Sequence, residues 1–324
     1  MMYKKKILFF GLGSIGQRHA KLIQNNYDYE LFAYRNNKKN KHISDIEEVY
    51  TLKGIARIKP DIIFITNPTS MHIDSILSVI KLKPHFFIEK PLCEKIDDRV
   101  SKLLDIIKKD KLVTYVACQL RFHPIIQYIK KIIKGKKIFF SKIICSSFLP
   151  DWRPNRDYRN IYSAHKHLGG GVILDLIHEP DYCYWLFGSI KKIKGVFGQI
   201  SNLEIDSEDF ANLSIVHDSG MLSNVYLDYF GKTSKREIEI FAHDFNVHAD
   251  ILKNVITIRT SNEEQIYFGN LNNDDIYLKQ LNYFFNCIEN KQKPMNNIND
   301  HLKILYPIIS FKVSSQKSDR LYYA

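Results

Sequence analysis

The sequence predicts an α/β protein with a doubly wound parallel sheet, followed by an α+β domain with a large, mostly antiparallel open sheet. Three observations predict this fold. Short apolar runs alternate with helical stretches in the first third of the 324 residues, and a glycine-rich turn follows the first run. Beyond residue 120, strand-like runs alternate apolar and polar residues. We therefore expect one domain over residues 1–120 and a second over 121–324.

The first domain consists of repeated strand–helix units. Helices are expected near 14–25, 45–52, 70–82 and 97–109. The predicted strands are apolar and short, and they cover residues 7–10, 30–34, 62–66, 85–88 and 112–117. Such units form a parallel sheet whose ligands bind at the carboxyl ends of the strands.

The second domain begins with a helix over 124–133, opened by Pro124. Further helices are expected near 172–187, 274–289 and 299–313. The predicted strands cover residues 138–148, 190–199, 209–217, 221–230, 235–241, 245–250 and 254–259. Their alternation indicates an antiparallel sheet with one face exposed to solvent or to a partner subunit.

The turn after the first strand reads GLGSIG, which is the spacing of a dinucleotide-binding loop. Its first glycine allows a tight turn, its second lets a pyrophosphate approach the backbone, and its third lets the next helix pack closely. The motif alone is weak, because glycines also mark ordinary turns. Its position between a strand and a helix favours a Rossmann-type nucleotide site formed by Gly11, Gly13, Ser14, Ile15 and Gly16.

The second strand ends at Arg35, without the acidic residue that usually holds the ribose of NAD. Arg35, together with Lys38 or Lys39, can instead pair with a 2′-phosphate. A solvated basic turn is the alternative. The sequence therefore slightly favours NADP over NAD.

Polar segments also follow the next two predicted strands. Thr66, Asn67, Pro68 and His72 follow the third strand, where a helix start is the alternative interpretation. Glu89, Lys90 and Pro91 follow the fourth. A lysine at this edge can polarise a reacting oxygen with Glu89 orienting it, although a surface ion pair is also possible.

Two segments of the second domain carry candidate chemistry. Asp175 and His178 are three residues apart after a run of three glycines, so we expect them on one helix face as an acid–base pair. A buried structural histidine is the alternative. The segment 151–159 offers an aromatic surface and three arginines for an anionic sugar, or forms surface salt bridges.

Composition narrows the class of function. The net charge is +12, but the lysines are dispersed, so we expect an anionic small-molecule substrate and no nucleic-acid partner. Five scattered cysteines without CxxC spacing predict neither disulfides nor a metal site. The absence of a membrane-length apolar stretch and of a signal-peptide pattern predicts a cytoplasmic protein.

Together these motifs resemble the glucose–fructose oxidoreductase/inositol dehydrogenase (Gfo/Idh/MocA) family over nearly the whole chain, with Glu89-Lys90-Pro91 as the most specific match. The resemblance implies an NAD(P)-binding domain and a second domain for substrate binding and oligomerisation. It implies a homodimer or homotetramer formed through the second sheet. It assigns the nicotinamide side of the cofactor site to Thr66, Asn67, Pro68, His72, Glu89, Lys90 and Gln119.

The resemblance also implies reversible hydride transfer between nicotinamide C4 and a sugar carbinol carbon. His178 would accept the hydroxyl proton, Lys90 would polarise that oxygen, and Asp175 would complete the catalytic set. Family members often separate the last two residues by four positions rather than three. The implied substrate contacts are Arg121, Trp152, Arg153, Tyr158, Arg159 and His178.

The segment around Trp152 resembles that of members in bacterial surface-sugar pathways, which implies a phosphorylated, nucleotide-linked or acidic sugar. An NAD-dependent polyol or inositol dehydrogenase is one alternative. A non-catalytic nucleotide-binding regulator is the other, although retention of Lys90, Asp175 and His178 argues against it.

Overall fold

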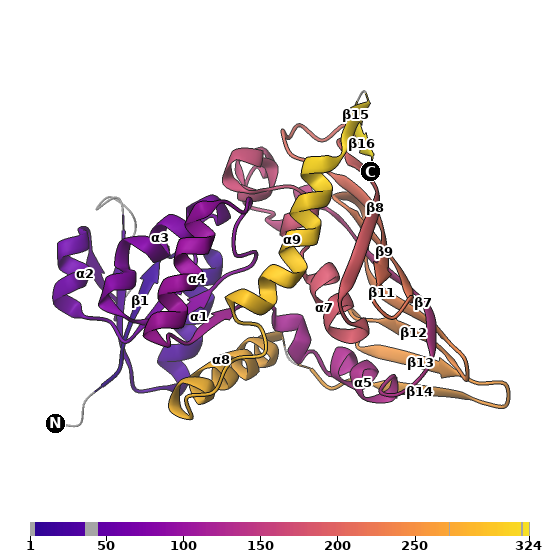
Figure 1. The fold of residues 1–324 in the computed structure, drawn as a ribbon, viewed down its shortest axis with the longest axis horizontal. Helices are drawn as coiled ribbons and strands as arrows, with labels where there is room; N and C mark the ends of the chain where they lie inside the picture. The colour runs from indigo at the N-terminus through magenta and orange to yellow at the C-terminus, as the bar shows by residue number, and fades with distance from the viewer. Residues whose placement is uncertain (1–3, 36–44, 272, 319, 324) are drawn as a thin grey trace. The chain divides into compact units, whose positions relative to one another are not determined.

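The computed structural model describes residues 4–35, 45–271, 273–318 and 320–323. The chain forms two compact units (Figure 1). The first comprises Met1–Ala117 and Tyr277–His301, and the second comprises Cys118–Ile276 and Leu302–Ala324. The expected division at residue 120 lies close to the first crossing between units. The sequence did not predict that Tyr277–His301 would return to the first unit.

The described part of the first unit contains a six-stranded parallel sheet in the order β3-β2-β1-β4-β5-β6. This is the doubly wound order, and it reverses between β1 and β4, where ligands bind. It confirms the predicted fold class. The strands are β1 Lys6–Phe10, β2 Glu30–Tyr34, β3 Glu47–Val49, β4 Ile62–Ile65, β5 His85–Ile88 and β6 Thr114–Val116.

The helix predicted at 45–52 is wrong. That segment contains the edge strand β3, and α2 (Leu52–Ile58) begins only after it. Thr51 is the N-cap, because its hydroxyl accepts a hydrogen bond from the Gly54 amide at 3.0 Å. The other helices of the αβ units are α1 Ser14–Asn26, α3 His72–Val79 and α4 Asp98–Asp110.

Helix α8 (Asn273–Glu289) returns to the first unit because it carries aromatic side chains that the sheet buries. The Phe284 ring lies 5.4 Å from that of Phe87 and 6.3 Å from that of Phe64, centroid to centroid. Phe284 is fully buried. Burying one such side chain contributes about 1.5–3 kcal/mol.

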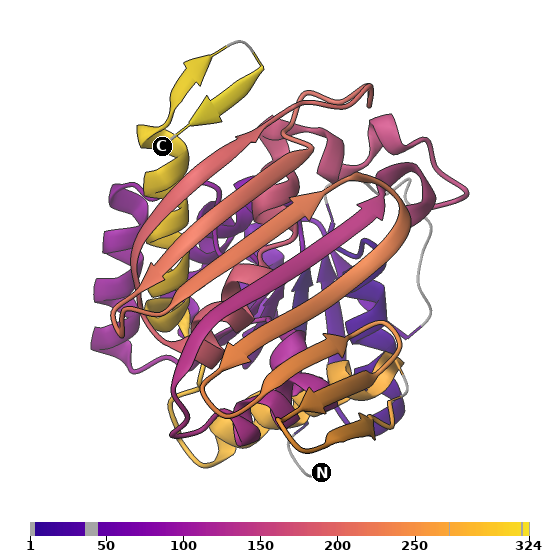
Figure 2. The ribbon, with the colours of Figure 1, turned by 90° about the vertical axis from the view of Figure 1, so that its right-hand side faces the viewer.

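The described part of the second unit contains a ten-stranded sheet in the order β14-β13-β12-β11-β7-β10-β9-β8-β16-β15 (Figure 2). Among the described strands of this sheet, β7 and β10 pair in parallel and all other neighbours pair antiparallel. The sequence did not predict β14, β15 or β16, whose side chains are mostly exposed and show no apolar alternation. The strands are β7 Ile138–Phe148, β8 Ile190–Gly198, β9 Phe210–His217, β10 Leu222–Asp228, β11 Phe230–Ala242, β12 Asn246–Asp250, β13 Val255–Arg259, β14 Glu264–Phe268, β15 Gln316–Ser318 and β16 Leu321–Tyr323.

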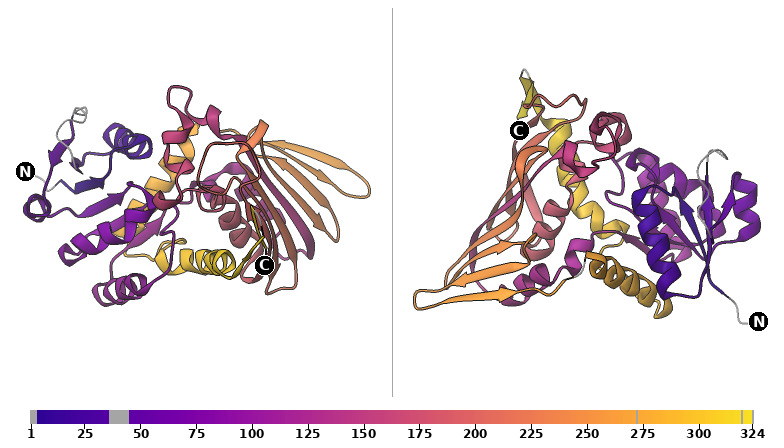
Figure 3. Two further views of the ribbon diagram at one scale, coloured as in Figure 1. Left: turned by 90° about the horizontal axis from the view of Figure 1, so that it is seen from above. Right: turned by 180° about the vertical axis from the view of Figure 1, so that it is seen from behind.

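Helices α5 (Pro124–Ile132), α7 (His178–Phe187) and α9 (Ile298–Ser314) lie on one side of this sheet, as Figure 3 also shows. The single helix predicted over 172–187 is instead two, α6 (Val172–Asp175) and α7. Pro180 explains the interruption. It has no amide hydrogen for the carbonyl of Leu176, and its ring would clash with that carbonyl in a continuous helix.

No helix in the described ranges combines the length and apolar character needed to cross a membrane. All five cysteines lie within these ranges, and each is buried with a free thiol.

Candidate functional site

The glycine loop of the first unit is tightly packed at two of its three glycines. Gly11 has a φ of +99°, and a Cβ at Gly16 would lie 2.5 Å from the Gly11 carbonyl oxygen. The Thr66 hydroxyl donates to that same oxygen at 2.6 Å. These contacts hold the loops after β1 and β4 together where the strand order reverses.

Gly13 differs, because a Cβ built there would meet no described atom within 4 Å. The loop therefore leaves open space beside Gly13 at the N-terminus of α1. The N-cap residue of this helix, Gly13, provides no side-chain cap, and the first turn contains no acidic residue. Its free amide groups and positive dipole end suit a pyrophosphate.

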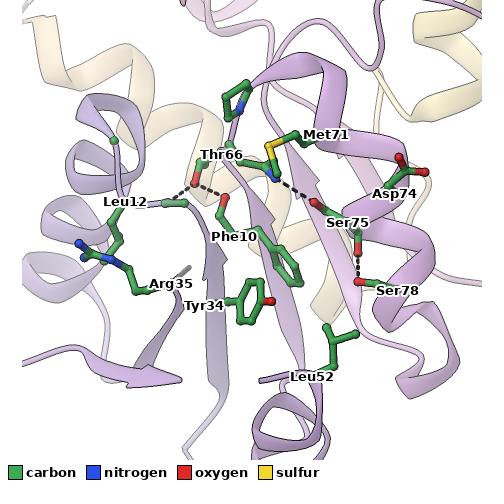
Figure 4. Close-up of a pocket in the computed structure, with 14 residues that line it drawn as sticks. Phe10, Leu12, Tyr34, Arg35, Leu52, Thr66, Met71, Asp74, Ser75 and Ser78 are labelled. Atoms are coloured by element: carbon green, nitrogen blue, oxygen red, sulfur yellow. Dashed lines mark hydrogen bonds between the residues drawn. The ribbon is translucent and has the colours of Figure 1, made fainter. Parts of the chain in front are cut away.

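A cavity of about 610 Å³ opens beside this loop (Figure 4). Its size and its mixed polar and apolar walls are those of a small-molecule site. The lining residues come from the ends of β1, β2 and β4 and from α2 and α3, and they are Phe10, Gly11, Leu12, Gly13, Tyr34, Arg35, Leu52, Thr66, Asn67, Pro68, Met71, Asp74, Ser75 and Ser78.

Asn67 supplies an unsatisfied polar atom in this wall. Its amide nitrogen donates to the Ser75 hydroxyl at 2.8 Å, whereas its buried Oδ1 has no hydrogen-bond partner among the described residues. An unpaired buried acceptor is costly, so a ligand donor at this position would be favoured. A nucleotide, with its phosphates and hydroxyls, fits the glycine loop and this acceptor together.

Arg35, which the sequence predicts as a contact for a 2′-phosphate, forms an ion pair with an acidic side chain of the protein. Its Nη1 lies 3.2 Å from Oε1 of Glu48, and the two side chains are 10% and 8% exposed. The acid that is absent from the end of β2 is therefore supplied by the neighbouring strand β3. Lys38 and Lys39, the other proposed phosphate contacts, lie outside the described residues.

Glu89 holds the loop that carries Lys90. Its carboxylate contacts Nε2 of the fully buried His19 at 2.8 Å and accepts a bond from the Lys90 amide at 3.3 Å. The bond from Lys90 to Pro91 is cis. Glu89 thus positions the backbone of this loop. The sequence did not identify His19 as part of this site, because its partner Glu89 lies 70 residues away in the chain.

His72 connects the same loop to the loop after β4. Its ring nitrogens lie 2.9 Å from the Asn67 carbonyl oxygen and 3.0 Å from that of Pro91. Burial lowers the pKa of His72, and the two carbonyl oxygens act in the opposite direction. The structure therefore shows His72 joining two loops from inside the unit, where the sequence predicts a cofactor contact.

In the second unit, the short helix η3 (Gln119–Phe122) places Gln119 beside His178 at the start of α7. The Gln119 amide nitrogen lies 3.3 Å from Nε2 of His178. His178 is 5% exposed. Two predicted site residues, 59 positions apart, thus meet within one unit.

Asp175 and His178 lie on different helices, so the prediction that they share one helix face is wrong. It ends α6, and its Oδ2 accepts hydrogen bonds from the Ser163 hydroxyl at 2.5 Å and the Tyr229 hydroxyl at 3.2 Å. Burial, reinforced by the Asp175 charge, raises the pKa of Tyr229 well above its usual value. The phenol therefore stays protonated and keeps donating to Asp175.

Arg121 forms a buried ion pair rather than an exposed anion site. Its Nε and Nη2 donate to the two carboxylate oxygens of Asp181 at 2.8 and 2.7 Å. The side chains are 2% and 1% exposed. An anionic substrate would have to break this bidentate pair to reach Arg121, which the sequence predicts as a substrate contact.

The predicted sugar-binding segment divides into two parts. Trp152 packs edge-on against Tyr229 at 5.3 Å between ring centroids, so it contacts one of the two residues that donate to Asp175. Arg159 is exposed and pairs with Asp157 at 2.8 Å and Glu204 at 2.9 Å. The Tyr158 hydroxyl accepts a bond from the Glu204 amide at 3.2 Å.

Comparisons with known proteins agree with this architecture. Residues 5–118 match the model of an oxidoreductase family with an NAD-binding Rossmann fold, and residues 126–245 match the Gfo/Idh/MocA C-terminal domain. Myo-inositol 2-dehydrogenase of Thermotoga maritima is 23% identical over 312 residues, which are 89% of this chain and 90% of that enzyme.

Two solved structures share the fold. UDP-N-acetylglucosamine 3-dehydrogenase from Acidithiobacillus ferrooxidans superposes with a TM-score of 0.80 at 18% identity, covering 97% of this chain and 98% of the other. A levoglucosan dehydrogenase in complex with NADH superposes with a TM-score of 0.83 at 14% identity, covering 99% of both chains.

Proposed function

Because the chain belongs to the Gfo/Idh/MocA oxidoreductase family, we propose that it is an NAD(P)-dependent dehydrogenase or reductase that acts on a sugar CH–OH group. The observation that carries the proposal is the nucleotide site of the first unit. Its open Gly13, the uncapped N-terminus of α1 and the unpaired Asn67 acceptor all suit a dinucleotide. The choice between NAD and NADP depends on Arg35 and its partner Glu48.

The proposed chemistry assigns roles to four side chains, His178, Gln119, Lys90 and Asp175. When bound, the nicotinamide supplies hydride exchange with the sugar carbon. His178 takes the proton of the sugar hydroxyl at Nε2 during oxidation and returns it during reduction. The Gln119 amide nitrogen, 3.3 Å from that atom, holds the ring until the substrate hydroxyl replaces it there. Lys90 polarises the same oxygen. Asp175 is held by Ser163 and Tyr229 and completes the catalytic set.

We propose a phosphorylated, nucleotide-linked or acidic sugar of surface-glycan biosynthesis as the substrate. The dehydrogenase that acts on UDP-N-acetylglucosamine, a nucleotide-linked sugar, shares the fold and supports this choice. An NAD-dependent polyol or inositol dehydrogenase is the second candidate, supported by the inositol dehydrogenase relative. A panel of both substrate classes, assayed by nicotinamide absorbance, separates them. Nucleotide binding without turnover of any sugar would instead favour a regulatory protein.

Replacing Arg153 and Arg159 together by glutamine is expected to raise KM for an anionic sugar at least tenfold with little change in kcat, because charged hydrogen bonds contribute to binding. Initial-rate kinetics measure this. Arg259→Gln, at an exposed arginine of the same unit outside this segment, is the matched control. An unchanged KM in the double variant would remove these arginines from the substrate site.

Gly13→Ala and Gly16→Ala test the nucleotide site. Gly13 has a φ of −69° and free space for a Cβ, so G13A should leave the unfolding midpoint unchanged and weaken nucleotide binding about tenfold or more by obstructing the phosphates. G16A should also lower stability, by about 1–3 kcal/mol, because its Cβ meets the Gly11 carbonyl. Fluorescence titration with NADH and NADPH measures binding. Equal nucleotide affinity in G13A and the wild type would contradict this placement of the phosphates.

We also propose that the chain forms a homodimer or homotetramer through the ten-stranded sheet. Leu222 and Phe241 on β10 and β11 are 48% and 39% exposed, which supports an interface there. Sedimentation velocity would measure the oligomeric state, and a monomer at micromolar concentration would reject the proposal.

A further inference from the structure

The pairing of Arg35 with Glu48 bears on which dinucleotide the chain selects. Strands β2 and β3 run in parallel with Ala33 opposite Glu48, and the Arg35 amide donates to the Val49 carbonyl oxygen at 3.0 Å. Glu48 is therefore held beside Arg35 by backbone pairing as well as by the ion pair. The Tyr50 hydroxyl donates to Oε2 of Glu48, so both carboxylate oxygens are engaged.

The charge of this pair opposes a phosphate. Arg35 lines the nucleotide cavity with Leu12 and Gly13. An arginine there accommodates the 2′-phosphate of NADP when its guanidinium can pair with the phosphate oxygens. Here the guanidinium already faces a carboxylate 3.2 Å away, and both side chains are almost completely buried. Binding a 2′-phosphate would separate the pair or leave Glu48 beside an anion of the same sign, and either costs free energy.

We propose that Glu48 is the residue that determines cofactor preference, and that it makes this chain favour NAD over NADP. The inference rests on the proposed nucleotide site and reverses the preference that the sequence predicts. That prediction depended on the absence of an acid at the end of β2. The structure places an acid, Glu48, beside Arg35, although Glu48 lies 13 residues further along the chain.

The experiment measures Kd for NADH and for NADPH by fluorescence titration of the full-length protein and of four variants. Glu48→Gln keeps the size of the side chain and removes its charge. Glu47→Gln removes the same charge from an exposed neighbouring position on β3 and is the matched control. Arg35→Gln is measured alone and combined with Glu48→Gln.

The wild type is expected to bind NADH more tightly than NADPH. In E48Q the ratio of Kd for NADPH to Kd for NADH should fall about tenfold, as expected for removing one nearby charge from a partly buried site. The ratio should change less than twofold in E47Q. The gain in relative affinity for NADPH that E48Q shows should disappear in the double variant. The reason is that the gain depends on Arg35, which E48Q frees to pair with the 2′-phosphate.

Three results would overturn the inference while leaving the nucleotide site intact: a wild type that prefers NADPH, an E48Q ratio equal to that of the wild type, or a gain that persists in the double variant. If the wild type binds neither nucleotide, the proposed function fails as well. Circular dichroism checks that each variant is folded. Should E48Q unfold, Glu48→Asp replaces it, and a smaller shift toward NADPH is expected because the shortened carboxylate holds Arg35 less closely.

Discussion

Replacing His178 by alanine should lower kcat by about 10²–10⁴-fold, the usual contribution of a general base. His178 lies at the start of α7 with Nε2 3.3 Å from the Gln119 amide nitrogen, and alanine removes the only group there that we propose to move the hydroxyl proton. Because His178 is proposed to move the substrate proton and not to bind the nucleotide, Kd for the nucleotide should change little. Single-turnover kinetics together with nucleotide titration measure the two effects separately.

His178→Asn is the second variant, because asparagine can keep a hydrogen bond to Gln119 but has no basic nitrogen to accept the proton. It should be nearly as slow as H178A. His243→Ala, at an exposed histidine of the same unit, is the control and should retain full turnover. Normal turnover in both His178 variants would remove this residue from the mechanism and leave the substrate proton with another group.

The largest effect on stability is expected at the pair of Arg121 and Asp181. Arg121→Met or Asp181→Asn alone should lower the free energy of unfolding by about 3–5 kcal/mol, because either change leaves an uncompensated buried charge. Both side chains are at most 2% exposed and share two hydrogen bonds. Urea unfolding followed by circular dichroism measures the loss.

A double variant, Arg121→Met with Asp181→Leu, should recover part of that loss, since a hydrophobic pair of similar volume often replaces a buried ion pair. Arg159→Met is the control for a solvent-exposed ion pair and should leave stability nearly unchanged. Single variants at Arg121 and Asp181 that are no less stable than R159M would contradict the assignment of a buried, energetically coupled pair.

The parts of the fold that were correctly predicted carry a local signal. Apolar runs bounded by turns identified β1, β2, β4 and β5, and the glycine spacing identified the nucleotide loop. The strands that were predicted wrongly or missed lack such a local signal. The edge strand β3 has only three residues, and β14 has no buried side chain, so neither has the periodicity that distinguishes a strand. The break between α6 and α7 is the exception, because Pro180 marks it in the sequence.

For the candidate site, the sequence identified residue types and the structure supplied their partners. Gly11, Thr66 and Asn67 were expected near a nucleotide, and they line the cavity beside the glycine loop, because parallel strands bring their carboxyl ends to one edge of the sheet. Arg121 and His72 were expected to contact ligands, yet both are buried with protein partners. No spacing along the chain indicates that Arg121 meets Asp181, 60 residues later.

Backbone conformation and hydrophobic period are local properties, so the order of residues was sufficient for most strands of the two sheets and for the glycine loop. Electrostatic pairing depends instead on distances between strands and helices that are remote in the chain. The tertiary structure alone decided that Glu48 neutralises Arg35, that His19 holds Glu89, and that Tyr229 donates to Asp175. The net charge that a side chain presents to a ligand depends on these protein partners. The sequence alone therefore does not determine it.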